Sequence, residues 1–189
     1  RRIVKFGDPA LQTPAARVET VGPELQPLID DMVETMYAAP GIGLAAPQVG
    51  VGLRIFVVDV SAGRNAADLI VMINPEFVTQ EGMQIEEEGC LSLPGFDATV
   101  VRPERVVVRG LDRDGTSRTV EAAGLLARAF QHEMDHLAGS LFVDRLRGIK
   151  RDLIVRYEIG LSVVLRRSKL AYGVGFPGDR VSHLGGNPA

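Results

Sequence analysis

Two histidines with a glutamate directly behind the first stand in the hexapeptide QHEMDH, residues 131–136. On a helix, positions i and i+4 share one face, so His132 and His136 can present two imidazole nitrogens to one divalent ion. Glu133 would then sit beside the ion without binding it, where a general base is needed. The alternative is a chance occurrence on a solvated helix. The largely apolar flanks ARAF and LAGSLF disfavour it, because unpartnered buried imidazoles are costly.

A catalytic site of this kind needs a third protein ligand and one open position, and the residues leave the third ligand open. The long metalloprotease signature requires a histidine where this chain has Phe142, so that interpretation fails. His183 lies in a Gly- and Pro-rich tail, whereas Glu158 would complete the two-histidine, one-glutamate site of a small zinc endopeptidase. Cys90, in EEEGCLSLPG, is another candidate for the third ligand. The alternative is that Cys90 is only a small hydrophobic side chain buried in the core.

Three stretches of the sequence resemble the peptide deformylases: GIGLAAPQ (41–48), EGCLS (88–92) and QHEMDH (131–136). The resemblance covers roughly residues 2–150, including the opening IVKFGDPALQTPA and the LFVDRL that follows the third motif. It implies a compact α+β domain, in which antiparallel sheets pack around a central HExxH helix, with further helices near the N- and C-terminal ends. It also implies removal of the formyl group from the N-terminal formyl-methionine of newly synthesised polypeptides, which releases formate.

The resemblance implies a metal centre as well. Cys90, His132 and His136 would bind one divalent ion, Fe2+ in the cell, with Zn2+, Ni2+ or Co2+ as alternatives in a purified sample. A thiolate and two neutral imidazoles leave one net positive charge on such an ion. Glu133 would take a proton from the attacking water and later deliver it to the departing amine. The enzyme hypothesis stands against a structural metal module that binds nascent chains or ribosomes, which has no use for a carboxylate at an open coordination position.

Two donors to an oxyanion and a substrate pocket complete the implied site. The Gln48 side-chain amide and the Leu91 backbone N–H would hold the oxyanion, and the alternative for Gln48 is hydrogen bonding within a turn. Arg128 lies one helical turn before His132, and either shapes substrate binding or pairs with an acidic residue of 86–88. The candidates for the substrate pocket are Ile42, Gly43, Leu44, Gly89, Arg128 and Ala129.

Composition and charge restrict the classes of partner. With 189 residues, 46% of them hydrophobic, the chain can build a core of its own, and a single cysteine excludes an internal disulfide. The formal net charge of -3 gives no basic field for nucleic acid, and no apolar run is long enough for a membrane span. The expected partners are N-formylmethionyl nascent peptides, at the ribosome exit. The expected location is the cytoplasm of a bacterial-type cell, or an organelle if a transit peptide has been removed.

Hydrophobic periodicity predicts the helices that would position these residues. Apolar residues recur at three- and four-residue spacing in 23–39, and the pattern is helical again from 124 to 137 and in 149–167. The first 167 residues would form the catalytic domain, and 168–189 would be a Gly- and Pro-rich tail of unknown role.

The predicted strands are short and rich in β-branched residues. RIFVVDV (54–60) and DLIVMI (68–73) are typical of buried strands, and 105–122 contains Asp114-Gly115 between two strand-like runs, a hairpin signal. Residues 41–50 carry too much Gly and Pro for regular structure, so we expect a loop there.

Overall fold

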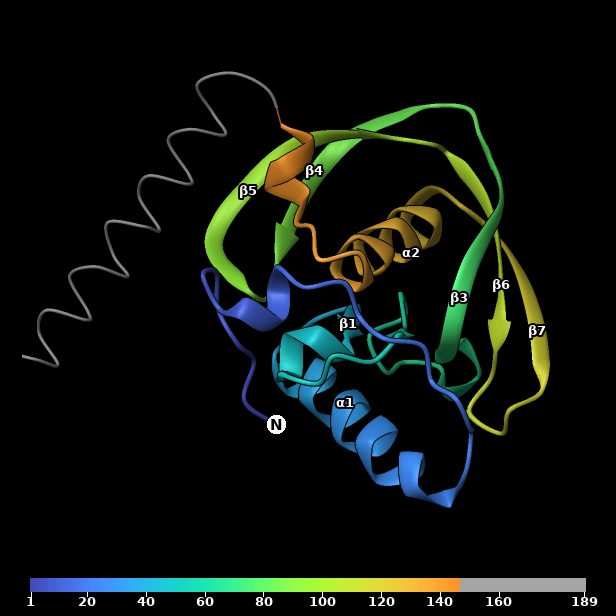
Figure 1. Ribbon diagram of the computed structural model, residues 1–189. Helices are drawn as coiled ribbons and strands as arrows, with labels where there is room; N and C mark the ends of the chain where they lie inside the picture. Colours follow the sequence, from blue (N-terminus) through green and yellow to red (C-terminus); the bar gives the residue numbers. More distant parts are fainter. Residues whose placement is uncertain (147–189) are drawn as a thin grey trace, which may run out of the picture.

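The computed structural model describes residues 1–146, which form an α+β domain with two antiparallel sheets (Figure 1). The larger sheet has the strand order β1-β2-β3-β6-β7 and the smaller one pairs β4 with β5. The strands are β1 Gly43–Ala45, β2 Ile55–Val58, β3 Ile70–Glu81, β4 Gln84–Cys90, β5 Leu93–Arg102, β6 Arg105–Leu111 and β7 Ser117–Ala123. The α-helices are α1 Gln26–Ala38 and α2 Gly124–Leu137, and 3-10 turns occur at Pro9–Leu11, Pro23–Leu25, Ala46–Val49, Ala66–Asp68 and Phe142–Arg145. Neither α-helix in this part of the chain has the length and hydropathy that a bilayer crossing requires.

The two helices cover opposite faces of the larger sheet because β2 is apolar on both sides. Ile55 and Val57 pack with the apolar face of α1, while Phe56 and Val58 pack with α2. All four side chains are buried, as expected for a central strand that has a helix on each face. The strand therefore fixes α2, which carries QHEMDH, within the core.

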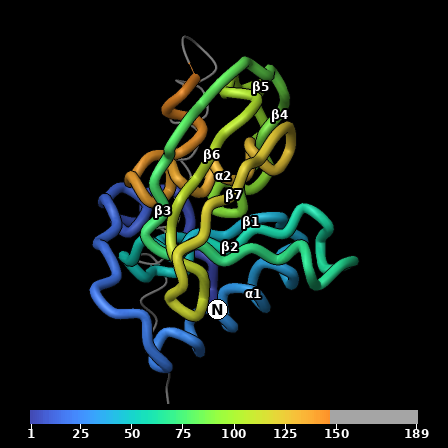
Figure 2. The backbone as a smooth tube through the Cα atoms, turned by 90° about the vertical axis from the view of Figure 1, so that its right-hand side faces the viewer, coloured from blue at the N-terminus to red at the C-terminus, as the bar shows by residue number. Residues whose placement is uncertain are grey.

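The smaller sheet closes the other side of α2. Figure 1 shows α2 between β4 and β5 on one side and β3, β6 and β7 on the other, and Figure 2 shows β4 and β5 at the end of the molecule opposite α1. Ala98 and Val100 on the inner face of β5 pack with Leu141 and Phe142, just after the helix. The HExxH helix is thus enclosed by both sheets.

Several predicted elements are confirmed. The helix predicted over 23–39 is a 3-10 turn followed by α1, and the helix predicted over 124–137 is α2. The hairpin around Asp114-Gly115 joins β6 to β7, with a loop in which the Asp112 carboxylate accepts the N–H groups of Asp114 and Thr116. The predicted helix 149–167 and tail 168–189 lie outside the described residues, as do Glu158 and His183.

One prediction was wrong, and two strands were not predicted. Residues 41–50 are not all irregular, because Gly43–Ala45 pair with Phe56–Val58 as β1 and Pro47 lies in the first turn of a 3-10 helix. β4 and β5 were not predicted at all. The acidic run of β4 is a poor strand former, and it is held by pairing with the alternating inward and outward residues of β5.

Gly139, just after α2, provides a test of backbone packing. Its φ is +73°, and a Cβ there would lie 2.9 Å from the carbonyl carbon of Thr13. We expect Gly139→Ala to lower the free energy of unfolding by about 1–3 kcal/mol, through both the strained φ and the backbone contact. Urea titration measures this change.

Gly52→Ala is the matched control, because nothing lies within 4 Å of a Cβ at that exposed glycine. Its effect should stay within about 0.5 kcal/mol, the usual range for surface substitutions. Equal stability of the two variants would show that the close approach at Gly139 is unimportant.

Candidate metal centre

Cys90, His132 and His136 bring three donor atoms together between β4 and α2. One ligand atom from each lies within 4.8 Å of the others, and Sγ of Cys90 is 3.3 Å from Nε2 of His136. Within residues 1–146 this is the one group of three or more Cys, His, Asp or Glu side chains with that geometry. The i, i+4 spacing on α2 places both imidazoles on one side of the helix, and the end of β4 supplies the thiol. A thiolate and two imidazoles suit a tetrahedral divalent site with one open position.

The pKa values of the two histidines shift in opposite directions. Burial alone would lower the pKa of His132, but its hydrogen bonds to Cys90 and Glu88 outweigh burial and raise the pKa well above the usual value. Burial, with the nearby charges of His132 and Arg102, holds the pKa of His136 well below its usual range, so this imidazole is neutral and free to coordinate. Nδ1 of His132 lies 3.2 Å from Oε2 of Glu88, which leaves Nε2 on the side of Cys90. A carboxylate behind a ligating histidine is the usual means of fixing its ring and tautomer.

Glu88 is a buried carboxylate with several cationic partners. Arg102 donates to both of its oxygens, with Nη2 at 2.7 Å from Oε2, and Nη1 of Arg128 donates to Oε1 at 2.8 Å. Burial alone would raise the pKa of Glu88, but the hydrogen bonds from His132 and Arg102 outweigh it and lower the pKa to about 2. Glu88 therefore stays ionised behind His132.

The same arginine links Glu88, behind His132, to the end of the described chain. Arg102 is wholly buried and also donates to Oδ2 of Asp135 at 2.9 Å. Asp135 in turn accepts from Nε of Arg145 at 2.6 Å. Asp135 thus supports the site and directs its carboxylate at two arginines.

The acidic partner that the sequence predicted for Arg128 is confirmed, whereas its role in substrate binding stays a prediction. Its ion pair is with Glu88, and it also lines the cavity described below. Its Nη1 lies 3.2 Å from the carbonyl oxygen of Glu86, and its Nη2 lies 3.2 Å from Oε1 of Gln84. These contacts hold the guanidinium against the wall.

Glu133 lies beside the three donors and has a free carboxyl oxygen. Its side chain is buried, and Oε2 has no hydrogen-bond partner among the described residues. Burial raises the pKa of Glu133 to about 7, even though the charges of His132 and Arg102 oppose the shift. A Cβ on Gly43 would overlap Oε1 of Glu133, so the bare backbone of β1 makes room for this carboxyl.

Gln48 is anchored at one end of its amide and faces the site with the other. Oε1 accepts the N–H of Ala45 at 2.8 Å, whereas Nε2 lies 3.3 Å from Oγ of Ser92 and 3.7 Å from Sγ of Cys90. The hydrogen bond within the turn is therefore present, and it leaves Nε2 directed toward Cys90. On the other side of Cys90, Leu91 is held through its carbonyl oxygen, which accepts from Nζ of Lys5 at 2.7 Å.

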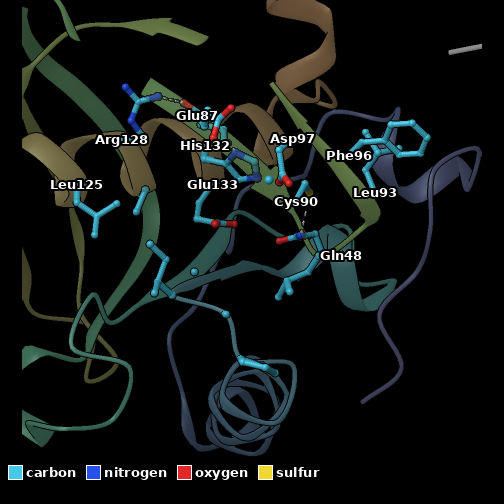
Figure 3. A pocket seen from close by; sticks show the side chains of 18 of the residues that line it. Gln48, Glu87, Cys90, Leu93, Phe96, Asp97, Leu125, Arg128, His132 and Glu133 are labelled. Carbon is cyan, nitrogen blue, oxygen red and sulfur yellow. Dashed lines mark hydrogen bonds and ion pairs between the residues drawn. The ribbon is translucent and has the colours of Figure 1, made fainter. Parts of the chain in front are cut away.

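A cavity of about 380 Å³ opens beside these groups (Figure 3). Five predicted pocket residues line it: Ile42, Gly43, Gly89, Arg128 and Ala129. Leu44 does not, because it is wholly buried in the core that packs on α1, and its assignment to the pocket was wrong. The cavity is also lined by four residues that were not predicted from the sequence: Leu93, Phe96, Asp97 and Leu125. Leu125 could have been found, since it precedes Arg128 and Ala129 by three and four residues on the same helix.

Comparisons with known proteins identify one family of relatives. The family model described as polypeptide deformylase matches residues 1–152. A peptide deformylase of Acidobacterium capsulatum is 53% identical over 156 residues, which cover 82% of this chain and 92% of the relative. A peptide deformylase of Xylella fastidiosa is 56% identical over 157 residues, which cover 82% of this chain and 91% of the relative. The crystal structure of a peptide deformylase from Legionella pneumophila has a TM-score of 0.80 at 46% identity and covers 88% of this chain and 98% of that one. A peptide deformylase from Synechococcus elongatus, in complex with actinonin, has a TM-score of 0.76 at 45% identity and covers 79% and 82%.

Removal of the thiol tests the ligand set. We expect Cys90→Ala to abolish stoichiometric binding of a divalent ion, because two imidazoles alone hold it weakly. The measurement is metal content after desalting, together with the melting temperature. Glu158→Gln, the control for the endopeptidase alternative, should leave metal content unchanged. The reverse pattern would make Glu158 the third ligand.

Proposed function

The chain belongs to the polypeptide deformylase family, and on this premise we propose that it is a metal-dependent hydrolase that removes the formyl group from N-terminal formyl-methionine and releases formate. The observation that carries the proposal is the convergence of three metal-type donors beside the free carboxyl of Glu133, at the end of a cavity. A purely structural metal module would have no use for that carboxyl.

We propose Cys90, His132 and His136 as the ligands of one divalent ion, with Fe2+ as the native metal and Zn2+, Ni2+ or Co2+ as substitutes in purified protein. The mixed thiolate and imidazole set suits any of these ions. When bound, the ion supplies Lewis acidity toward water and toward the formyl carbonyl. Glu88 would keep His132 in the tautomer that binds the ion.

Glu133 would move the protons of the reaction. Its carboxylate would take a proton from the water that attacks the formyl carbon, and the resulting acid would deliver a proton to the departing methionine amine. Both steps need a carboxyl group that is easily protonated and deprotonated near neutral pH, and burial gives Glu133 a pKa of about 7. The room left by Gly43 lets the carboxyl approach the cavity.

Gln48 and Leu91 would stabilise the negative charge that develops on the formyl oxygen. Nε2 of Gln48 is aimed by the bond from Ala45 N–H to Oε1, so it needs little reorganisation during the reaction. The backbone N–H of Leu91 would be the second donor, in a segment that Lys5 restrains through the neighbouring carbonyl.

Two free strand edges border the cavity and would receive an extended peptide. β1 is an end strand that pairs with β2, and β4 pairs with β5, so each has one edge that is not used in the sheets. Gly43 of β1 and Gly89 of β4 both line the cavity. A substrate strand between them could hydrogen-bond to both edges. Its methionine side chain would enter the apolar part of the cavity, beside Leu125 and Ala129.

The biological setting is part of the same proposal. The substrates would be N-formylmethionyl nascent chains as they leave the ribosome, and the enzyme would work in the cytoplasm. Direct nucleic-acid binding is not expected, given the formal net charge of -3.

The decisive experiment is formate release from a formyl-Met-Ala-Ser peptide by anaerobically purified protein of known metal content. We expect turnover by the natural sequence, and a loss of about 10²–10⁴-fold in Glu133→Ala at unchanged metal content, since the variant binds the ion but cannot move the protons. An inactive, metal-loaded natural sequence would refute the function. Parallel loss of metal and activity in the variant would refute the assigned role of Glu133.

Gln48 has a structural bond and a proposed catalytic one, so Gln48→Ala should affect two measurements. The melting temperature should fall because the N–H of Ala45 loses its buried partner. Turnover per folded molecule should also fall, on the order of 10²-fold in kcat and kcat/KM together, because the oxyanion loses a donor. Ser92→Ala is the control, since it removes only the Oγ beside Nε2. A destabilised Gln48→Ala variant with full turnover per folded molecule would exclude the oxyanion role.

A further inference from the structure

The charged side chains around the cavity differ in whether they are paired with an opposite charge. Its charged lining residues, apart from His132, are Glu87, Glu88, Asp97, Arg128 and Glu133. Arg128 is ion-paired with Glu88, and both are buried in the wall. Glu133 is buried beside the metal donors. The two remaining charges are the carboxylates of Glu87 and Asp97, and both of these residues are exposed.

Glu87 and Asp97 lie on the same face of the β4–β5 hairpin. The register pairs Glu87 with Thr99 and Gly89 with Asp97, so the two acidic residues are diagonal neighbours across the strands. A Cβ on Gly89 would overlap Oδ1 of Asp97, which places that carboxylate across Gly89, one residue before Cys90. Figure 3 shows Asp97 beside Cys90.

Neither carboxylate is neutralised within the part of the chain that the structure describes. No hydrogen bond or ion pair joins either side chain to another residue of 1–146. Lys5, which reaches Leu91 from the N-terminal segment, donates to that residue's carbonyl oxygen and does not line the cavity. The rim therefore has an uncompensated negative charge.

We propose that Glu87 and Asp97 make the enzyme prefer formyl-methionyl peptides with a lysine or arginine in the first two positions after the methionine. This inference rests on the proposed function. A peptide held against the free edge of β4 passes Gly89 as it leaves the cavity, and its next side chains come close to the two carboxylates. A cation there is attracted and an anion is repelled, without any change at the reacting group.

The test compares kcat/KM for formyl-Met-Lys-Ala and formyl-Met-Ala-Lys with their glutamate counterparts. At about 20 mM salt we expect the lysine peptide to be favoured by about threefold to tenfold in at least one position. The ratio should approach one at about 500 mM salt, because screening shortens the range of the charges. A ratio near one at low salt in both positions would overturn the inference.

Variants assign the preference to these carboxylates. Asp97→Asn and Glu87→Gln should each reduce the lysine-to-glutamate ratio, and Asp97→Lys should invert it. Asp114→Asn is the matched control, because it removes the same charge from the exposed β6–β7 turn and should keep the natural ratio. A natural ratio in both Asp97→Asn and Glu87→Gln would also overturn the inference. Inactivity on every formyl peptide would instead refute the proposed function, and this inference with it.

Discussion

The ionised carboxylate of Glu88 is the interaction on which the rest of the site depends. It is buried, yet it accepts hydrogen bonds from Arg102, from Arg128 and from the ring of His132. A carboxylate in that position without these partners would be strongly disfavoured. Arg102 comes from β5 of the same sheet as Glu88, whereas Arg128 and His132 come from α2, so all three partners are present only when the smaller sheet has docked on the helix. The orientation of the His132 ring therefore depends on that docking.

Glu88 is connected to two further parts of the site. Through Arg102 it is linked to Asp135 and so to the turn after α2, and through the backbone of β4 it is linked to Cys90. The larger sheet contributes to the site mainly by leaving room for its side chains. Its short β1 leaves Gly43 bare against Glu133 and positions Gln48 just beyond the strand. The smaller sheet thus supplies Cys90 and supports His132 through Glu88, and the larger sheet borders Glu133 and Gln48.

Local patterns in the sequence predicted the elements and residues that carry a strong local signal. α2 follows from its periodicity, His132 and His136 from their spacing, and Cys90 and Gln48 from the family resemblance. β4 was missed because its acidic run forms a strand only through pairing with β5 and through the arginines behind it. Leu44 was misassigned because alternation along β1 sends it to the core on α1 while Gly43 borders the cavity. The pairing of β4 and the burial of Leu44 depend on contacts between segments that are distant in the sequence, and local sequence patterns do not predict such contacts.

The closeness of Gly43 and Glu133 also couples the evolution of two distant positions. Any residue with a Cβ at position 43 would overlap Oε1 of Glu133, so the carboxyl would have to move away from β1. The shorter aspartate would make the space, but it would withdraw the carboxyl from the cavity. Both changes move the carboxyl from its place beside β1, so positions 43 and 133 constrain each other although they lie far apart in the sequence.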